Sequence, residues 1–312
     1  MKIAIMGASS HIAENLIIRF ASEPVDHLTL FCRDPQPVKE FTHRYAHRGN
    51  IHIVTGYDNF NDFEFDVIIN CVGAGVPGST GFDIRNWFEV TAKFDELALN
   101  YLERYNPQAV LIAFSSGAVY GTRSVAPFTG ESCFSLPVNN IEISDYYSIA
   151  RIHSEARHRS RKNLRIADLR IFSFFSCFIK PDSGYFMSDV LKAVAEDEIL
   201  ITRQNDMVRD YIAPDDLFDI VNLCIRQSEI NEAFDVQSAA PAGKFEILES
   251  FRKQFGLKWK FDEVTASPNG DKSIYTSQYN PLKKLGFTPR FTSLESLMIE
   301  TEKYLKIHGN CK

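Results

Sequence analysis

The sequence predicts an α/β protein with a parallel sheet that is covered by helices on both faces, followed by a smaller α/β lobe. Over the first 172 residues, short apolar runs alternate with longer amphipathic stretches, which is typical of strands joined by crossover helices. The runs are apolar almost without interruption, as strands are when both faces of their sheet are buried. The alternation becomes looser after residue 172, so a second unit is expected there.

The first predicted strand covers residues 2–6 (KIAIM), and a helix is predicted over 11–21. Further strands are predicted at 27–32, 51–55, 65–72, 109–115 and 164–172, with helices over 85–105 and 147–161. Right-handed crossovers wind such a sheet in two directions and open a crevice at the carboxyl ends of its strands. Later helices are predicted over 186–196, 215–227 (capped by an aspartate near its start), about 247–255 and about 294–306, with a short strand over 234–236.

The order of these elements predicts how the chain is divided. We expect a Rossmann-like doubly wound domain over residues 1–172, with 208–238 returning to it. Residues 173–207 and 239–312 are predicted to form a smaller substrate-binding lobe. A chain of 312 residues suits one large domain or two unequal ones, because domains typically have about 100–200 residues.

Composition excludes several classes of protein. Lys and Arg total 34 against 40 Asp and Glu, a net charge of −6, so a general electrostatic grip on nucleic acid is not expected. No apolar window reaches the length of a membrane span, and the N-terminal apolar stretch is too short for a signal sequence. Six cysteines lie without CxxC pairs, several in apolar runs, which predicts free buried thiols in a reducing cytoplasm.

The histidines and basic residues do not predict a metal or nucleic-acid site. The eight histidines show no metal-ligand spacing. His153 and His158 are expected on the surface of their helix, and the basic run 157–162 is interpreted as its solvated C-terminal end. A hydrolase is not favoured, because neither Ser116 nor Cys133 has a histidine partner at a recognisable position.

A glycine-containing turn joins the first strand to the first helix. It reads Gly7-Ala8-Ser9-Ser10-His11-Ile12-Ala13, at the place where a doubly wound sheet binds a dinucleotide pyrophosphate. Two of the three usual glycines are missing, but Ser10 and Ala13 are small enough to replace them if the second position does not need positive φ. Candidate cofactor contacts are therefore Gly7, Ser9, Ser10, His11 and Ile12; the alternative is an ordinary strand–helix turn.

The end of the second strand predicts which dinucleotide binds. Cys32 and Arg33 stand where an acidic residue would hold an adenosine 2′-hydroxyl. A guanidinium can bind a 2′-phosphate and stack on adenine, so we predict NADP in preference to NAD. Alternatively, Arg33 is a solvated loop residue and Asp34 contacts the ribose. Further candidate cofactor contacts are Cys71 and Val72, at the end of the predicted strand 65–72.

Three separated segments carry the remaining chemistry. The predicted strand 109–115 runs into FSSGAVYG (114–121), Tyr147 stands four residues before Arg151, and RDYI (209–212) precedes two aspartates. In this order, over roughly residues 1–240, the chain resembles the NAD(P)-dependent epimerase/dehydratase family of extended short-chain dehydrogenases/reductases. Members of that family modify nucleotide sugars.

The resemblance implies roles for four residues. Ser116 would be the catalytic hydroxyl and Tyr147 the acid/base, with Arg151 where the family has a lysine. Arg209 matches the arginine that holds the substrate diphosphate, so Ser116, Tyr147 and Arg209 would contact substrate. Tyr147 and Arg151 would also contact the cofactor. The resemblance further implies a homodimer through the long helices.

The expected chemistry is hydride transfer at a sugar carbon. A phenol with an ordinary pKa of about 10 is a weak base at neutral pH. A cation one helical turn away favours the phenolate, and a serine hydroxyl can orient the reacting oxygen. Tyr146 is the discounted alternative, because the position four residues after it is Ala150.

Departures from the family pattern refine the prediction. Gly117 and Ala118 stand where dehydratases of the family carry Asp-Glu, so dehydration is not expected. Arginine at 151 keeps a charge but is bulkier and forked. We predict an NADP-dependent oxidoreductase on a nucleotide-activated sugar, in first place a 4-keto reductase. The alternatives are an epimerase and a non-catalytic NADP-binding sensor.

Overall fold

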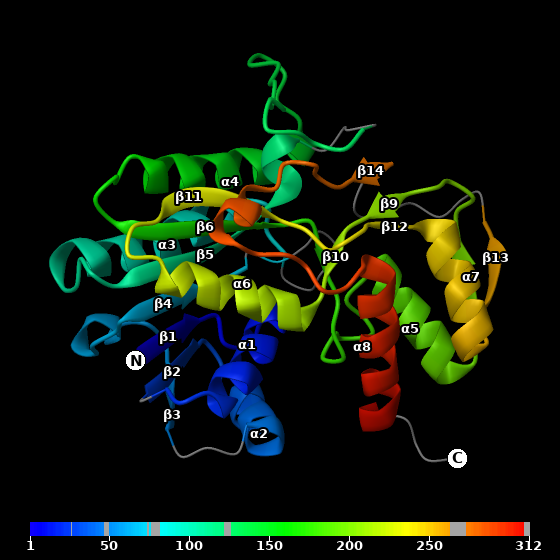
Figure 1. Ribbon diagram of the computed structural model, residues 1–312, viewed down its shortest axis with the longest axis horizontal. Helices are drawn as coiled ribbons and strands as arrows, with labels where there is room; N and C mark the ends of the chain where they lie inside the picture. Colours follow the sequence, from blue (N-terminus) through cyan, green and yellow to red (C-terminus); the bar gives the residue numbers. More distant parts are fainter. Residues whose placement is uncertain are drawn as a thin grey trace.

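The computed structural model describes residues 1–25, 27–46, 50–73, 75, 82–121, 126–262 and 273–308. Its central feature is a seven-stranded sheet in the order β11-β6-β5-β4-β1-β2-β3, in which every pairing is parallel (Figure 1). The strands are β1 (Lys2–Met6), β2 (His27–Cys32), β3 (Ile51–Thr55), β4 (Val67–Asn70), β5 (Val110–Ser116), β6 (Arg165–Ile171) and β11 (Asn231–Val236). The order reverses between β1 and β4, which confirms the predicted doubly wound fold and places a crevice at that point.

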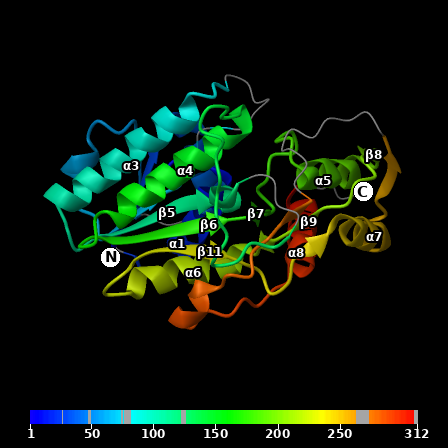
Figure 2. The same ribbon diagram turned by 90° about the horizontal axis from the view of Figure 1, so that it is seen from above.

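Helices cover both faces of this sheet. They are α1 (His11–Ser22), α2 (Pro35–Tyr45), α3 (Asn86–Arg104), α4 (Ile143–Arg159) and α6 (Pro214–Arg226). Figure 2 shows α3 and α4 side by side on one face, with α1 and α6 on the other. Successive strand residues point to opposite faces. In β1, Ile3 and Ile5 therefore join one core and Ala4 and Met6 the other, and all four are fully buried.

A second region lies beside the carboxyl ends of β5, β6 and β11 (Figure 1). Its elements are β7 (Ser173–Phe174), α5 (Phe186–Glu196), β8 (Ile199–Thr202), β9 (Val208–Arg209), β10 (Tyr211–Ile212), β12 (Ala242–Gly243), α7 (Lys244–Phe255), β13 (Lys258–Phe261), β14 (Ile274–Tyr275) and α8 (Ser293–His308). The strands among these elements form three small sheets, β10-β7, β12-β9-β14 and β13-β8. Phe175, Val190, Phe251 and Leu297 lie in their own fully buried core. Three 3₁₀ helices complete the fold: η1 (Phe60–Asp62), η2 (Gly117–Tyr120) and η3 (Pro281–Leu285).

The structure differs from the sequence predictions at two helices, α2 and α6. Helix α2 was missed, because two prolines stand in its first turn; proline is tolerated there, and Asp34 caps the helix by accepting the amide of Gln36 at 3.0 Å. Helix α6 is not capped by an aspartate, since its N-cap is Ala213. Asp216, within the helix, instead accepts the backbone amide of Arg290 at 2.9 Å.

The prediction that His158 lies on the surface is wrong. Its side chain is fully buried between α3, α4 and β6, with Nδ1 2.8 Å from Asp168 and Nε2 3.9 Å from Asp95. Burial opposes the charge of His158, but Asp168 and Asp95 outweigh it and raise the pKa of the imidazole. His153 is exposed, as predicted.

Contrary to the sequence prediction, the basic run 157–162 is not simply solvated. Its three arginines pair with carboxylates: Arg157 with Glu96, Arg159 with Asp168 and Arg161 with Glu103.

Three further findings concern the described residues. Their five cysteines are unpaired, four of them buried and Cys133 exposed; Cys311 lies outside this part of the chain. Within the same part, no three His, Cys, Asp or Glu side chains are grouped as metal ligands would be. None of the described helices has the length and apolarity needed to cross a membrane.

Candidate active site

The glycine loop has the geometry that dinucleotide binding requires. Gly7 adopts φ +72°, and a Cβ there would lie 2.9 Å from the backbone of Cys71 and Val72. Only glycine therefore lets this loop approach the end of β4 so closely. Ser10 has φ −81° and caps α1, accepting the amide of Ala13 at 3.3 Å. Position 10, the second of the usual glycine positions, thus needs no positive φ, and serine replaces glycine there without strain.

The start of α1 presents hydrogen-bond donors to this loop. The first amides of a helix have no partner within it, and Ser10 satisfies that of Ala13. His11 and Ile12 are the first two residues of α1, and amides at such positions can donate to an anion. Ser9 is exposed beside them.

Tyr57 supports the loop and was missed from the sequence. Its hydroxyl accepts the amide of Gly7 at 2.9 Å and donates to the carbonyl of Phe31 at 3.3 Å. Its ring meets Phe94 of α3 edge-on at 4.6 Å. Burial raises the pKa of Tyr57 to about 12, against the hydrogen bond from Gly7, so the phenol stays neutral and holds the loop against β2.

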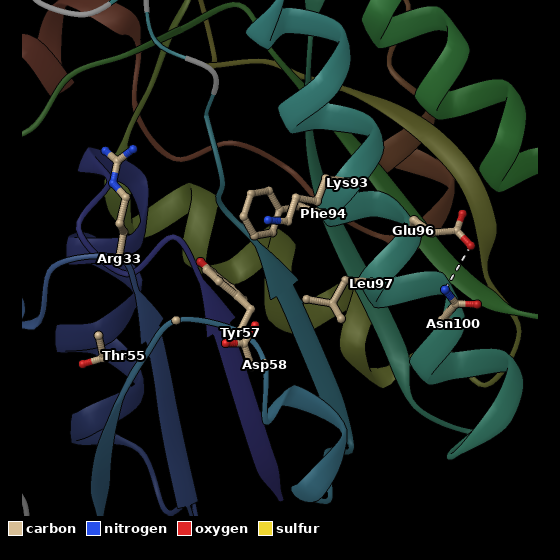
Figure 3. Close-up of a pocket in the computed structure, with 10 residues that line it drawn as sticks. Arg33, Thr55, Tyr57, Asp58, Lys93, Phe94, Glu96, Leu97 and Asn100 are labelled. Atoms are coloured by element: carbon tan, nitrogen blue, oxygen red, sulfur yellow. Dashed lines mark hydrogen bonds between the residues drawn. The ribbon is translucent and has the colours of Figure 1, made fainter.

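A pocket of about 560 Å³ opens at the carboxyl ends of β2 and β3 (Figure 3). Tyr57 and Phe94 face each other in it, which offers aromatic surface, and Arg33 and Lys93 are exposed cations at its lining. Its other lining residues are Thr55, Gly56, Asp58, Glu96, Leu97 and Asn100. Asp34 is engaged as the cap of α2, while Arg33 lines the pocket.

The two serines at the end of β5 have different surroundings. Ser115 is buried and donates to the carboxylate of Glu155 at 2.6 Å. Ser116 is half-buried and caps η2, its Oγ accepting the amide of Ala118 at 3.2 Å. Its Oγ also lies 3.1 Å from the hydroxyl of Tyr275. Of the two, Ser116 is the serine available to a ligand.

Tyr147 and Arg151 lie one turn apart on α4. The guanidinium carbon of Arg151 is 5.1 Å from the centre of the Tyr147 ring, and Trp87 lies 5.6 Å from the same ring. Arg151 Nη1 donates to the carbonyl of Phe114 at 3.1 Å. Burial opposes the charge of Arg151, but Tyr147 and the neighbouring carboxylates outweigh it and raise its pKa. Arg151 is thus a fixed cation beside the phenol.

One donor of Arg151 remains unused within the described residues. Its Nε is buried and has no hydrogen-bond partner there. Such a donor next to Tyr147 fits a ribose hydroxyl, the group that the family's lysine is expected to contact. Together with the Gly7 turn and the pocket at Arg33, this shows that the residues fit a nicotinamide dinucleotide.

The small sheet β12-β9-β14 brings two further residues to the site. Arg209 of β9 and Tyr275 of β14 are register partners in a parallel pairing. Arg209 is half-buried, and burial lowers its pKa against the effect of nearby Tyr211 and Tyr275. The pairing therefore joins the strand of Arg209 to the strand whose tyrosine reaches Ser116 at the end of β5.

His11 connects the glycine loop to the segment after β7. Its Nε2 lies 2.7 Å from Ser176 Oγ, which also accepts from the side chain of Asn15 at 2.9 Å and the amide of Phe178 at 3.2 Å. Both lone pairs of Ser176 are therefore taken, so its proton goes to His11 Nε2 and the ring carries its own proton on Nδ1. Burial lowers the pKa of His11 to about 4, against the effect of Ser176, so the imidazole is neutral.

A doubly wound parallel sheet with this glycine turn and adjoining pocket defines a dinucleotide-binding protein of the Rossmann type. Residues 3–236 match the NAD dependent epimerase/dehydratase family, and the chain belongs to that family.

Relatives agree with this assignment. The chain is 22% identical over 212 residues to UDP-glucuronate 4-epimerase 4 of Arabidopsis thaliana, a match that covers 61% of this chain and 47%, about half, of that protein. Among solved structures, a variant UDP-glucuronic acid 4-epimerase of Bacillus cereus has a TM-score of 0.79 at 17% identity, covering 98% of this chain and 99% of its own. The dTDP-glucose 4,6-dehydratase of Bacillus anthracis has a TM-score of 0.77 at 16% identity, covering 99% and 97%. Both structures contain NAD, and both likenesses establish the fold.

Proposed function

We propose that this chain is an NADP-preferring oxidoreductase that reduces the 4-keto group of a nucleotide-activated sugar. The observation that carries the proposal is the arrangement at the ends of β5 and α4. Ser116 has a half-buried hydroxyl, and Tyr147 stands beside the fixed cation of Arg151. Ser116 ends β5, and the glycine loop follows β1 at the same edge of the parallel sheet, where the carboxyl ends of the strands lie. Proteins with this fold bind their dinucleotide at that edge.

The proposed reaction assigns one task to each side chain. When bound, the reduced nicotinamide supplies a hydride. The carbonyl carbon of the sugar accepts that hydride, and the π electron pair of the C=O bond moves to oxygen. Tyr147 gives its proton to this oxygen, completing the hydroxyl, and Ser116 donates a hydrogen bond to it. The phenolate that remains on Tyr147 is stabilised by Arg151 and regains a proton from solvent.

Arg151 changes one part of this scheme. A guanidinium does not lose its proton in proteins, so Arg151 cannot relay a proton as a lysine can. Its Nη1 is held by the carbonyl of Phe114, which fixes the cation beside Tyr147. In the proton transfer we assign to Arg151 an electrostatic role only, beside the ribose contact that its Nε offers.

Cofactor preference is supported by two side chains at the pocket lining, the exposed cations Arg33 and Lys93. A guanidinium or an ammonium can bind the 2′-phosphate of NADP. The lining also holds Asp58 and Glu96, of which Glu96 is paired with Arg157. A reductase consumes its reduced cofactor and must exchange it, which agrees with NADP. An epimerase returns the hydride to its substrate and needs no exchange.

Substrate binding is assigned to the later segments. We propose that residues 173–207 and 239–312 bind the sugar and that Arg209 holds the diphosphate. Dehydration is not proposed, because Gly117 carries no carboxylate and its position is closely packed: a Cβ there would lie 2.4 Å from the ring of Phe172. A carboxylate side chain at this position would require the Phe172 ring to move.

The test is oxidation of NADPH, followed by its absorbance, with a panel of nucleotide 4-keto sugars. Tyr147→Phe should lose at least about a hundredfold in kcat, as expected when a general acid is removed. The matched control is Tyr146→Phe, which removes the neighbouring phenol that packs on Phe88 at 5.8 Å and should retain turnover. Equal rates in the two variants would refute the assigned acid.

Binding measurements test the cofactor assignment separately. NADPH should bind more tightly than NADH in a fluorescence titration. Arg33→Ala should weaken NADPH about tenfold to a hundredfold, the value of one charge-assisted hydrogen bond, and leave NADH unchanged. Arg44→Ala, an exposed arginine on α2, is the control. Tighter binding of NADH by the unchanged protein contradicts the assignment.

Two other functions are distinguished by the same assays. The named epimerase relatives favour a nucleotide-sugar epimerase, which would interconvert a sugar pair without net oxidation of NADPH. A sensor would bind NADPH tightly, yet show neither reduction nor epimerisation with any sugar of the panel.

A homodimer is proposed through α3 and α4. Phe88 on α3 is 37% exposed, and Val138, Ile141 and Ile143 before and at the start of α4 are 80%, 40% and 65% exposed. Phe88 lies 5.8 Å from Tyr146 near the start of α4, so exposed apolar side chains stand on both helices where they meet, and such side chains can form an interaction surface. Light scattering of the purified protein and of Ile143→Asp should give a dimer and a monomer respectively. A monomer in both refutes the proposal.

A further inference from the structure

Tyr275 reaches the site from a part of the chain beyond the family match. It lies on β14, whereas the match ends at residue 236. The side chain is 6% exposed, and its ring lies 5.2 Å from Phe172 and 6.3 Å from Phe128. The phenolic oxygen is 3.1 Å from Ser116 Oγ. A second tyrosine therefore contacts the serine to which the reaction assigns a hydrogen bond.

The backbone on the C-terminal side of Tyr275 is fixed to the main sheet. Ser277 Oγ donates to Asp235 of β11 at 2.5 Å, and the side-chain amide of Gln237 donates to the carbonyl of Ser277 at 2.8 Å. The amide of Phe128 donates to the carbonyl of Thr276 at 2.9 Å. These bonds, with the packed ring, leave the phenol little freedom to turn away from the end of β5.

The bonding capacity of Ser116 decides what this contact does. A serine hydroxyl has one proton and two lone pairs. The amide of Ala118 donates to one lone pair at 3.2 Å. If Tyr275 donates to the other, Ser116 can only donate its proton to a ligand. If Ser116 instead donates to Tyr275, it can only accept from a ligand. A carbonyl oxygen that receives a hydride becomes negative and needs a donor.

We propose that Tyr275 is a positioning residue whose phenol donates to Ser116 Oγ and thereby fixes the Ser116 hydroxyl as the donor to the carbonyl oxygen of a keto substrate. The inference rests on the proposed function, since it takes a keto sugar as substrate. Tyr275 does not transfer a proton in the reaction. It sets the direction in which the Ser116 proton points before the substrate arrives.

Burial keeps the Tyr275 phenol in the protonated form that the proposed hydrogen bond requires. Burial raises the pKa of Tyr275, against the hydrogen bond with Ser116 and with a smaller contribution from nearby Tyr147. The phenol is therefore protonated throughout the neutral range and remains able to donate. The pairing of β14 with β9 also makes Tyr275 the register partner of Arg209, the residue to which we assign the substrate diphosphate.

The experiment is a double-mutant cycle of Tyr275→Phe and Ser116→Ala with the keto-sugar assay. Tyr275→Phe keeps the ring that packs on Phe172 and removes only the hydroxyl. We expect kcat to fall about tenfold, equivalent to about 1.4 kcal/mol, with the Kd for NADPH unchanged. In the Ser116→Ala background the same substitution should have almost no effect, because the group it positions is gone. Tyr279→Phe, on the same segment, is the matched control.

A merely structural Tyr275 predicts a different result, namely the same loss of kcat in both backgrounds. That outcome, or an unchanged kcat in Tyr275→Phe, overturns the inference while the proposed function stands. If the protein binds NADPH but reduces no keto sugar, the proposed function fails and the donor role fails with it. Denaturant unfolding of the four proteins then reports on the bond without any substrate: coupling supports the Ser116–Tyr275 contact, and additivity refutes it.

Discussion

Replacing Gly7 by alanine tests the glycine loop, and the chain contains a matched control for it. Gly7 and Gly256 both have φ +72°. A Cβ at Gly256 would have no atom within 4 Å, whereas one at Gly7 would lie 2.9 Å from the backbone of Cys71 and Val72. The two substitutions therefore share the backbone strain and differ in the steric clash.

The expected magnitudes follow from these two contributions. An alanine in the left-handed region costs about 1–2 kcal/mol, so Gly256→Ala should lower the free energy of unfolding by that amount. Gly7→Ala adds an overpacked contact worth about 1–3 kcal/mol, because backbone atoms cannot rotate away as a side chain can. Its total loss should be about 2–5 kcal/mol.

Urea unfolding followed by circular dichroism measures both losses, and an NADPH titration measures the effect on the site. Gly7→Ala should also weaken NADPH binding, because the loop must move away from β4 to admit the methyl group. Gly256→Ala, at the end of α7, should bind NADPH normally. Equal losses of stability in the two variants would falsify the close approach of the loop to β4.

Three further predictions concern the surroundings of the site. The raised pKa of His158 contributes stability that is complete below its unfolded pKa of about 6.5 and is lost as pH rises through the folded value. His158→Gln should therefore remove a slope of up to about 1.4 kcal/mol per pH unit, with the exposed His153→Gln as control; an unchanged slope contradicts this. Ser116→Ala should lower kcat, whereas Ser115→Ala should keep kcat and lose about 0.5–1.5 kcal/mol of stability, because it removes one hydrogen bond to the buried carboxylate of Glu155, which Arg170 still contacts at 2.6 Å; the reverse pattern would mean that the two serines have been misassigned. Arg151→Met should lose about a hundredfold in kcat and Arg151→Lys less than tenfold, since only the first removes the charge; wild-type turnover in the methionine variant refutes the electrostatic role.

The central sheet was predictable because burial on both faces leaves a simple pattern. Strands β1, β2 and β3 begin and end as expected, and helix α5 also has its predicted bounds. Helix α2 was hidden by its prolines, whose effect depends on whether they fall in the first turn. The two-residue strands β7, β9, β10, β12 and β14 are too short to show any period, so the arrangement of the second region could not be predicted from sequence.

Side-chain burial was the other limit of sequence reasoning. His158 follows a polar pattern that is typical of an exposed helical face, but Asp95 and Asp168 come to it from α3 and β6. A charged or polar residue can be buried when a partner satisfies it, and the partner is chosen by helix packing. The sequence shows the residue and not the neighbour.

The sequence by itself determined the fold class and the glycine turn, because the spacing of apolar residues along the chain records both. The roles assigned to Ser116, Tyr147 and Arg209 came from the resemblance of their motifs to the family and not from spacing alone. Tertiary structure alone decided the rest. Tyr57 lies 50 residues from Gly7, Ser176 lies 165 residues from His11, and Tyr275 lies 159 residues from Ser116. Hydrogen bonds over such separations depend on how the sheet, its helices and the small β12-β9-β14 sheet pack together, and no local period or motif records that packing.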